Sequence, residues 1–427
     1  MVNIQLEKAI EEIICQLAKK PFLSNKIKQI DKQISVDSDF CVIDWLASQK
    51  LYPKFYWQSR NQQQEVAALG QKKIINNITD IENNLANGER IYGGRGFSEQ
   101  NKKNQFFFIP EIELLRFEKK WHLKVNLDKK NNQTIKNLRS LNIKSINEKS
   151  FKSKIAKIEN IPDKHQWNQL VDKAILAISH DQLKKIVLAR ISTIQLSSNI
   201  NAAKLLKKSI SENNSSYHYM LEQNEDESFI GSSPERLFKK NGKSIQTEAL
   251  AGTSKRGQDA IEDIDLGNWL IKDNKNLAEL QIVVDDITEH LAKYVDEIKI
   301  EKQARIIKFR KVQHLIRKIS AKLFDNLTCS QLLKLLHPTA AVAGFPRSAA
   351  RKFIKNSEQF NRDWYSGYLG IISKQYSEFC VAIRCAKVKK NILSIYAGAG
   401  IVAGSNPELE WQELDNKSST ILSLINQ

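Results

Sequence analysis

The sequence predicts a mixed α/β protein in which antiparallel strands dominate. Amphipathic helical spacing occurs near both ends, short apolar strands separated by turn residues fill residues 39–127, and strands and helices mix irregularly from residue 164 onward. At 427 residues the chain exceeds the usual size of one compact core, so either two domains or one large α/β unit is expected.

The N-terminal third is expected to build a sheet. An opening helix has Ile10, Ile13, Ile14 and Leu17 on one face. Strands are then expected at 39–48, 54–60 and 65–70, a short helix is expected to stop at Asn87-Gly88 before another strand, and residues 112–127 are expected to form a hairpin with its tip near Glu118. The polar stretch 128–163 is expected to be a linker or excursion.

The remaining chain alternates helix and strand signals. An amphipathic helix beginning near Trp167 leads to a buried strand at 185–196. Asn241-Gly242 predicts a tight hairpin turn, because it supplies positive φ angles. One long helix is expected after Gly257, followed by strands at 367–373, 379–388 and 392–402 and a last helix from about Pro407 to Ile425.

The chain is strongly basic, with a net charge of +18 from 66 Lys and Arg against 48 Asp and Glu. The basic residues form short clusters mixed with Asn and Ile, without a long run or regularly spaced stacking aromatics. This distribution favours a lysine-rich solvated surface over a nucleic-acid groove.

Cysteine usage and hydropathy indicate the compartment. The five cysteines are an odd number without a C-x-x-C pair, which fits neither a disulfide framework nor a zinc site and predicts a reducing environment. No apolar run reaches the roughly 18 residues of a membrane span. We therefore expect a cytoplasmic protein with no membrane partner.

The segment 396–419 carries the densest chemical signal. Gly398, Gly400 and Gly404 are expected to leave backbone N–H groups open to an anion. Ser405 and Glu408 have capping-box spacing around Pro407, which predicts that a helix begins directly after this glycine loop.

Two acidic positions could hold a divalent cation. Glu410, Glu413 and Lys417 share one helical face, where an exposed salt bridge is the simpler reading and a hard oxygen ligand to Mg²⁺ is the alternative. Glu279 lies beside the apolar stripe of the helix expected after Gly257, near the edge of what that helix covers.

Three further residues leave a structural and a chemical reading open. Lys185 opens an apolar strand, where it could extend into solvent or act as a base in a cavity. Glu235 follows Pro234 and could pair with a cation or stay protonated. Arg384, read as mid-strand, must be paired or bind an anion, whereas His337 is read as a packed or loop histidine without a catalytic role.

Taken together, these segments resemble the chorismate-utilising enzymes, and among them the isochorismate synthases. Residues 167–427 carry the matching motifs in family order: KIVLAR, SPERL, TEALAGTSKRG, NLAELQIVVDDI, LHPTAAVAGFPR, WYSGYLG, VAIRCA, AGAGIV and EWQELDNK. YPKFYWQSRNQQQEVAALG and RIYGGRGF extend the resemblance to the N-terminal part and favour the menaquinone-pathway form over a siderophore-pathway form.

The resemblance implies an anthranilate-synthase-component-I-like fold, with two packed antiparallel-rich sheets flanked by helices. It makes residues 1–427 one chorismate-binding domain, with a sheet-building part at 1–127, the excursion at 128–163 and a catalytic core at 164–427. The implied reaction is Mg²⁺-dependent, reversible conversion of chorismate to isochorismate. Lys185 is the implied base, Glu235 the acid, and Glu279 and Glu413 the metal ligands; the implied substrate contacts are Gly252, Thr253, Tyr365, Arg384, Gly398, Gly400 and Lys417.

Two positions separate related reactions within the family. Anthranilate synthases generally carry Gln where this chain has Lys185, and aminodeoxychorismate synthases carry a nucleophilic Lys where it has Ala251. Salicylate synthase, which adds pyruvate elimination, stays an alternative. Because water is the implied nucleophile, no obligatory glutaminase subunit is expected, and the protein is expected to be a monomer or homodimer. Ala340 and Leu280 depart from the family's usual Pro and His.

Overall fold

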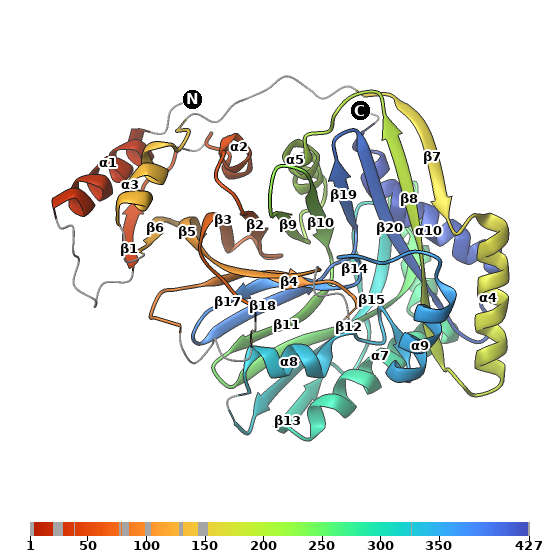
Figure 1. Cartoon of the computed structure of the whole chain (residues 1–427). Helices are drawn as coiled ribbons and strands as arrows, with labels where there is room; N and C mark the ends of the chain where they lie inside the picture. Colours follow the sequence, from red (N-terminus) through yellow and green to blue (C-terminus); the bar gives the residue numbers. More distant parts are fainter. Residues whose placement is uncertain are drawn as a thin grey trace.

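The computed structural model describes residues 4–19, 29–37, 39–76, 78, 85–98, 104–127, 131–143, 153–325 and 327–425. Its strands pair antiparallel throughout and form two groups that cross the molecule in different directions (Figure 1). The mixed α/β fold class with a large antiparallel component is confirmed.

The first group contains the strands that open and close the sequence. Its strands pair in the order β1 (Gln29–Ile34), β6 (Lys120–Asn126), β5 (Gln105–Phe117), β3 (Gln64–Ile74), β2 (Lys54–Gln58), β9 (Tyr217–Glu222), β10 (Ser228–Ser233), β19 (Cys385–Lys389), β20 (Ile392–Ile401) and β8 (Lys185–Leu196). The other edge of β8 pairs with β7 (Ile155–Ile161) and β16 (Gly344–Phe345).

The second group is built mainly from the middle of the chain. Its order is β4 (Ile91–Arg95), β17 (Tyr368–Ile372), β18 (Tyr376–Val381), β11 (Arg236–Asn241), β12 (Ser244–Lys255) and β15 (Val312–Leu323), with β13 (Val295–Ile300) and β14 (Arg305–Lys308) on the far side of β15. Strand β5 joins the groups, since residues 105–108 pair with β4 and residues 112–117 pair with β6. The two groups are thereby one continuous hydrogen-bonded network.

Helices cover the outer faces, and an aromatic-rich core containing Phe55, Trp57, Tyr92, Tyr219 and Trp364 fills the space between the strand groups. One outer core holds α1 (Ile4–Lys19), α2 (Val42–Ser48), α3 (Asn131–Arg139) and α5 (Ala202–Glu212). Another holds α7 (Asn274–Ala292) and α8 (Cys329–Leu336), and a third holds α4 (Lys164–Ser179), α9 (Arg347–Ser357) and α10 (Pro407–Leu422).

The strand predicted at 39–48 is wrong, because this segment forms α2. Val42, Trp45 and Leu46 have the i, i+3, i+4 spacing of a helix face and are buried together beside α5 and β3. In so short a segment, a helix with one buried face and a fully buried strand have similar sequence patterns of apolar residues.

The helix predicted after Gly257 is divided in two. Helix α6 (Ala260–Leu270) ends shortly before Asp273, whose side chain accepts a hydrogen bond from the backbone N–H of Asn276 and starts α7. The apolar stripe of α7 is as predicted, with Leu280, Val283 and Ile287 buried.

Several other predictions about elements are confirmed. The hairpin β5–β6 turns at Glu118, whose φ is +56°. The hairpin β11–β12 is also present, but its turn is one residue later than predicted: Asn241 pairs with Ser244, and the positive φ of +56° is at Gly242. The short helix expected before Asn87 lies mostly outside the described residues. Within 128–163 the structure describes α3 and β7, and the division of the chain into parts stays a prediction.

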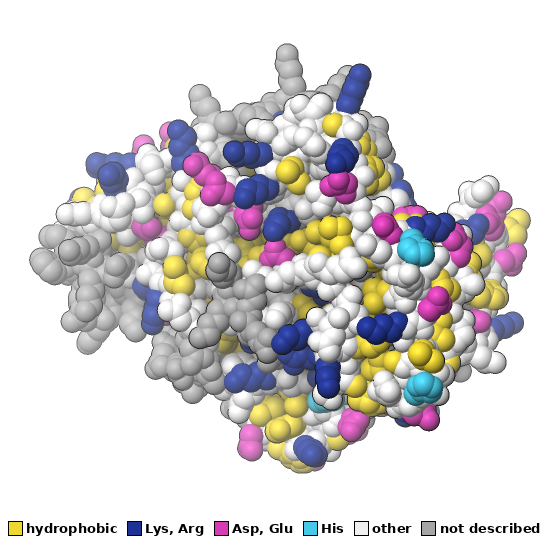
Figure 2. All heavy atoms as spheres, turned by 45° about the vertical axis from the view of Figure 1, so that its right-hand side comes forward, with side chains coloured by type: hydrophobic (Ala, Val, Ile, Leu, Met, Phe, Trp, Pro, Cys, Tyr) yellow, Lys and Arg dark blue, Asp and Glu magenta, His cyan; other side chains and the backbone are white. Residues whose placement is uncertain are grey.

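The surface agrees with a dispersed positive charge. On the face drawn in Figure 2, Lys and Arg side chains are scattered among acidic, apolar and uncharged groups. All five cysteines are free thiols. No helix in the part of the chain that the structure describes combines the length and apolar character needed to cross a bilayer.

Candidate active site

One cavity brings together all eleven residues to which the family resemblance assigns a role. It encloses about 680 Å³ of space, part of it open to solvent, between β8, β20, β12, α7 and α10. Its lining includes the predicted acid–base pair, the predicted metal ligands and all seven predicted substrate contacts: Lys185, Glu235, Gly252, Thr253, Glu279, Tyr365, Arg384, Gly398, Gly400, Glu413 and Lys417.

Lys185 is buried inside the cavity and does not extend to solvent. Its side chain is 1 % exposed, and its Nζ lies 2.9 Å from Oε1 of Glu279 on α7. Strand β8 begins at Lys185, and the neighbouring strand β20 places Gly400 against the same pair. A Cβ on Gly400 would lie 2.4 Å from Oε1 of Glu279 and 3.2 Å from Cε of Lys185. A side chain at this position would make the Glu279 carboxylate shift, so glycine lets the lysine and the carboxylate meet in this arrangement.

Glu235 lies where the chain passes from the first strand group to the second. Pro234 and Glu235 are the only residues between β10 and β11, and Glu235 is 3 % exposed. Burial, reinforced by the nearby negative charge of Glu248, raises the pKa of Glu235 to about 8, although Lys185 and Lys417 act in the opposite direction. The carboxyl is therefore protonated at neutral pH and can donate a proton.

The prediction that Arg384 lies mid-strand is wrong. Strand β18 ends at Val381 and β19 begins at Cys385, so Arg384 occupies the link between the two strand groups, with a φ of +51°. The apolar residues on both sides of Arg384 hid this break, because residues 379–381 and 385–386 are all buried and read as one strand. Burial lowers the pKa of Arg384 to about 10, and the guanidinium stays charged at neutral pH.

His314 supports Arg384 and was missed by the sequence reasoning. Its Nε2 accepts a hydrogen bond from Nη2 of Arg384 at 3.1 Å, while Nδ1 lies 3.2 Å from the carbonyl oxygen of Gly252 and 3.1 Å from Oγ1 of Thr253. Burial and the charges of Arg384 and Lys417 hold the pKa of His314 well below its usual range, so the ring is neutral. A single buried histidine on a strand gives no sequence signal for this role.

Gly252 and Thr253 lie at an irregularity of β12. The pairing with β15 shifts register between Ala251 and Thr253, and Gly252 has a φ of +74°. This bulge turns Thr253 toward the cavity, as bulges next to active sites commonly do.

The predicted glycine loop is wrong in part, since Gly398 and Gly400 belong to β20 and pair with Ala189 and Val187. Their contribution is space: a Cβ on Gly398 would lie 2.4 Å from the hydroxyl of Tyr365, which stacks on Tyr396 with ring centroids 5.5 Å apart. Burial raises the pKa of Tyr365 to about 12, so its hydroxyl is protonated and can donate.

The predicted capping box at Ser405 and Glu408 is also wrong. The cap of α10 is Asn406, whose side chain accepts from the backbone N–H groups of Glu408 and Leu409. Pro407 holds the first helical position, as predicted. The hydroxyl of Ser405 instead accepts from the backbone N–H of Val402.

Two carboxylates on the cavity wall could hold a divalent cation. Glu279 pairs with Lys185, and Glu413 pairs with Lys417, whose Nζ also donates to the carbonyl oxygen of Gly398 at 2.9 Å. Among the described residues no group of three or more His, Cys, Asp or Glu side chains converges as a complete metal cage. Two carboxylates completed by substrate and water nonetheless suit Mg²⁺, which seldom uses an all-protein site.

Glu410 and His337 lie outside the cavity lining. Glu410 is buried and pairs with Lys275 at 3.2 Å, and burial together with the charge of Glu413 raises its pKa. His337 donates from Nε2 to the carbonyl oxygen of Ser366 at 2.8 Å, and burial lowers its pKa to about 3. This neutral, packed histidine agrees with the sequence interpretation.

Comparison with known proteins gives concordant results. The family model described as "Chorismate binding enzyme" matches residues 14–426. The chain is 36 % identical to the isochorismate synthase MenF of Escherichia coli strain K12, over 98 % of this chain and 99 % of that protein. It is 35 % identical to the MenF of Pasteurella multocida, over 92 % and 93 % of the two chains.

Solved structures support the same relationship. The structure described as MenF, the menaquinone-specific isochorismate synthase from Escherichia coli, matches with a TM-score of 0.92 at 35 % identity and covers 98 % of this chain and 99 % of that chain. Anthranilate synthase component I from Streptococcus pneumoniae matches with a TM-score of 0.69 at 21 % identity over 93 % of each chain, which shows a shared fold. The chain therefore belongs to the chorismate-binding enzyme family.

Proposed function

We propose that this protein is an isochorismate synthase that supplies menaquinone biosynthesis. The observation that carries the proposal is the placement of a buried lysine and a protonated carboxyl in one cavity, where Lys185 and Glu235 have charged neighbours of both signs. The full-length similarity to menaquinone-pathway isochorismate synthases supports the same assignment.

The reaction needs one group that removes a proton and one that gives a proton. Water adds at ring carbon 2 of chorismate while the hydroxyl leaves carbon 4, so the double bonds of the ring shift and no atom is gained or lost overall. Lys185, in its free-amine form, takes the proton from the attacking water, and Glu235 protonates the departing hydroxyl. A carboxyl with a pKa of about 8 carries its proton at neutral pH, as this role requires.

The other cavity residues hold a substrate with two carboxylates. Arg384 offers a planar guanidinium, which suits a carboxylate, and Lys417 adds a second cation. Tyr365 and Thr253 provide hydroxyl groups, and the backbone at Gly252, Gly398 and Gly400 gives close access to the ring. No ammonia-supplying subunit is needed, because the nucleophile is water.

The proposal includes Mg²⁺ as cofactor. Glu279 and Glu413 would hold the ion, which supplies positive charge that neutralises a substrate carboxylate. Both side chains reach the cavity from helices that also bury apolar faces, so their backbones are rigidly placed.

The test is incubation of the purified protein with chorismate and Mg²⁺, without glutamine or ammonia, followed by chromatographic separation of products. We expect isochorismate and an equilibrium mixture that is also reached from isochorismate. Formation of salicylate with pyruvate would indicate salicylate synthase, and the absence of any conversion would refute the proposal.

A further inference from the structure

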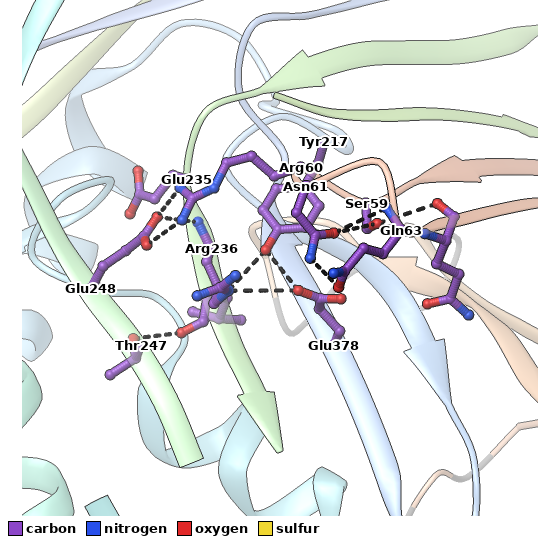
Figure 3. A network of polar contacts seen from close by, with 12 residues as sticks. Ser59, Arg60, Asn61, Gln63, Tyr217, Glu235, Arg236, Thr247, Glu248 and Glu378 are labelled. Carbon is purple, nitrogen blue, oxygen red and sulfur yellow. Dashed lines mark hydrogen bonds and ion pairs between the residues drawn. The ribbon is translucent and has the colours of Figure 1, made fainter. Parts of the chain in front are cut away.

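The segment that carries Glu235 is held by two residues that do not line the cavity. Arg60 donates from Nη1 to the carbonyl oxygen of Pro234 at 2.8 Å. Glu248 accepts from the backbone N–H of Arg236 at 3.0 Å, and Figure 3 shows Arg60, Glu248 and Arg236 together beside Glu235. The peptide groups on both sides of Glu235 are thus fixed by side chains, at a point where the chain leaves one strand group for the other.

Arg60 and Glu248 also bind each other. Nη1 and Nη2 of Arg60 lie 2.6 and 2.7 Å from Oε1 and Oε2 of Glu248. The carboxylate is fully enclosed and the arginine is largely buried, with side-chain exposures of 0 % and 14 %. A bidentate arginine–carboxylate pair has a defined plane and direction. The Arg60–Glu248 pair therefore holds both side chains in a fixed orientation.

The pair connects segments that are distant in sequence. Arg60 lies in the turn between β2 and β3, Glu248 lies on β12, and both reach the β10–β11 link (Figure 3). Arg236, the residue after Glu235, extends away from the cavity, where its Nε donates to the hydroxyl of Tyr217 at 2.8 Å. That hydroxyl in turn donates to Glu378 at 2.8 Å. Any movement of Glu235 along the chain would break contacts on both sides.

The charged groups around Glu235 come from three elements. Glu248 approaches from β12, Lys185 from β8 and Lys417 from α10. Among these three groups Glu248 supplies the negative charge, which opposes ionisation of Glu235, whereas the two lysines favour it. Arg60 pairs with Glu248 and so compensates a carboxylate that is enclosed in the protein.

We propose that Arg60 and Glu248 are positioning residues that hold the Pro234–Arg236 link so that the Glu235 carboxyl is presented to the cavity. This inference rests on the proposed function, in which Glu235 gives a proton to the leaving hydroxyl. Neither residue is assigned a contact with substrate.

The test compares Arg60→Lys, Glu248→Gln and the unaltered protein in chorismate turnover as a function of pH. Arg60→Lys keeps the charge but cannot hold both Glu248 and the Pro234 carbonyl in one plane. We expect its kcat to fall about tenfold, with KM for chorismate changed by less than about threefold and the pH profile unchanged.

Glu248→Gln should behave differently, because it removes negative charge beside Glu235. We expect a lower kcat and an alkaline limb that moves to lower pH, since Glu235 would then lose its proton more easily. Infrared spectroscopy gives a readout that does not depend on turnover. The C=O band of the protonated Glu235 carboxyl is identified as the band that is missing in Glu235→Gln. With rising pH, this band should disappear at a lower pH in Glu248→Gln than in the unaltered protein.

Glu65→Gln is the matched control. Glu65 and Arg116 form a similar pair, with Nε and Nη2 of Arg116 3.2 and 3.0 Å from Oε2 of Glu65, away from the cavity lining. The Glu65→Gln variant should have the same kcat and the same pH profile as the unaltered protein. The inference would be overturned if both test variants turned over chorismate within about twofold of the parent rate. It would also be overturned if kcat fell only in proportion to the amount of folded protein. If the unaltered protein does not convert chorismate, the proposed function fails first, and the infrared shift alone then decides whether Glu248 acts on Glu235.

Discussion

Gly400 and Glu279 lie so close that no side chain fits between them: a Cβ on residue 400 would lie 2.4 Å from Oε1 of the glutamate. Glu279 in turn holds Lys185 at 2.9 Å. The strand that carries the glycine, the helix that carries the carboxylate and the strand that carries the lysine are thus fitted together at the centre of the cavity. A substitution at Gly400 should therefore affect the chemistry more than the fold.

Gly400→Ala is expected to lower kcat/KM by about 100-fold, because the added methyl displaces Glu279 and the lysine paired with it. Steady-state kinetics with chorismate measures the effect, and circular dichroism checks that the sheet is intact. The control is Gly242→Asn in the β11–β12 turn, where no atom lies within 4 Å of the added Cβ and asparagine tolerates the φ of +56°. Equal losses in both variants would contradict the assignment of a special role to residue 400.

Lys185→Ala should reduce turnover by roughly 10²–10⁴-fold, the usual contribution of a positioned acid or base. The variant should still fold, because the lysine forms one edge of the cavity and the apolar core of β8 is unchanged. Lys184→Ala is the control, since Lys184 is exposed and lies over the ring of Phe345. A Lys185→Ala enzyme with a near-normal rate would remove this residue from the mechanism.

Removal of Mg²⁺ should abolish turnover, and the carboxylates should set the affinity for the ion. Glu413→Gln is expected to raise the Mg²⁺ concentration needed for half-maximal rate by at least about tenfold, because a neutral amide is a weaker ligand than a carboxylate. Glu408→Gln on the same helix is the control, since Glu408 is exposed and pairs with Lys164. Full activity of the unaltered protein in excess chelator would contradict the metal assignment.

The sequence predicted the contents of the site better than the path of the chain through it. All eleven predicted site residues line one cavity, because they were taken from motifs that match the family in order and such motifs keep their meaning without coordinates. The break at Arg384 was not predictable, since the buried apolar residues directly before and after it read as one strand. Arg60 and Glu248 were missed because their pairing joins segments 188 residues apart.

Local sequence rules failed where the same residues fit two local structures. Asn406 caps α10 although Ser405 had the capping-box spacing, because either side chain can accept from the first helical N–H groups. The same applies to α2, whose apolar residues satisfy a helical and an extended pattern alike. In each case tertiary contacts decide, and these contacts are not encoded in adjacent residues.

The stability of the protein should depend on pH through Glu235. Burial raises the pKa of its carboxyl from an ordinary 4.5 to about 8, so between these values the folded protein holds a proton that the unfolded chain has released. The free energy of unfolding therefore falls as pH rises through this window. Glutamine cannot ionise, so Glu235→Gln should gain stability relative to the parent with rising pH, by a few kcal/mol at most.

Thermal melting of both proteins at intervals between about pH 5 and pH 9 measures this difference. Glu408→Gln is again the control. Hydrogen bonds from Lys164 and Gln412 lower the pKa of Glu408, so its carboxyl is ionised throughout this pH range. The melting temperature of Glu408→Gln should therefore differ from that of the parent by the same amount at every pH. A constant difference between Glu235→Gln and the parent across the range would mean that Glu235 is already ionised at neutral pH. That result would remove the proton donor from the proposed reaction, even if the residue proved essential for turnover.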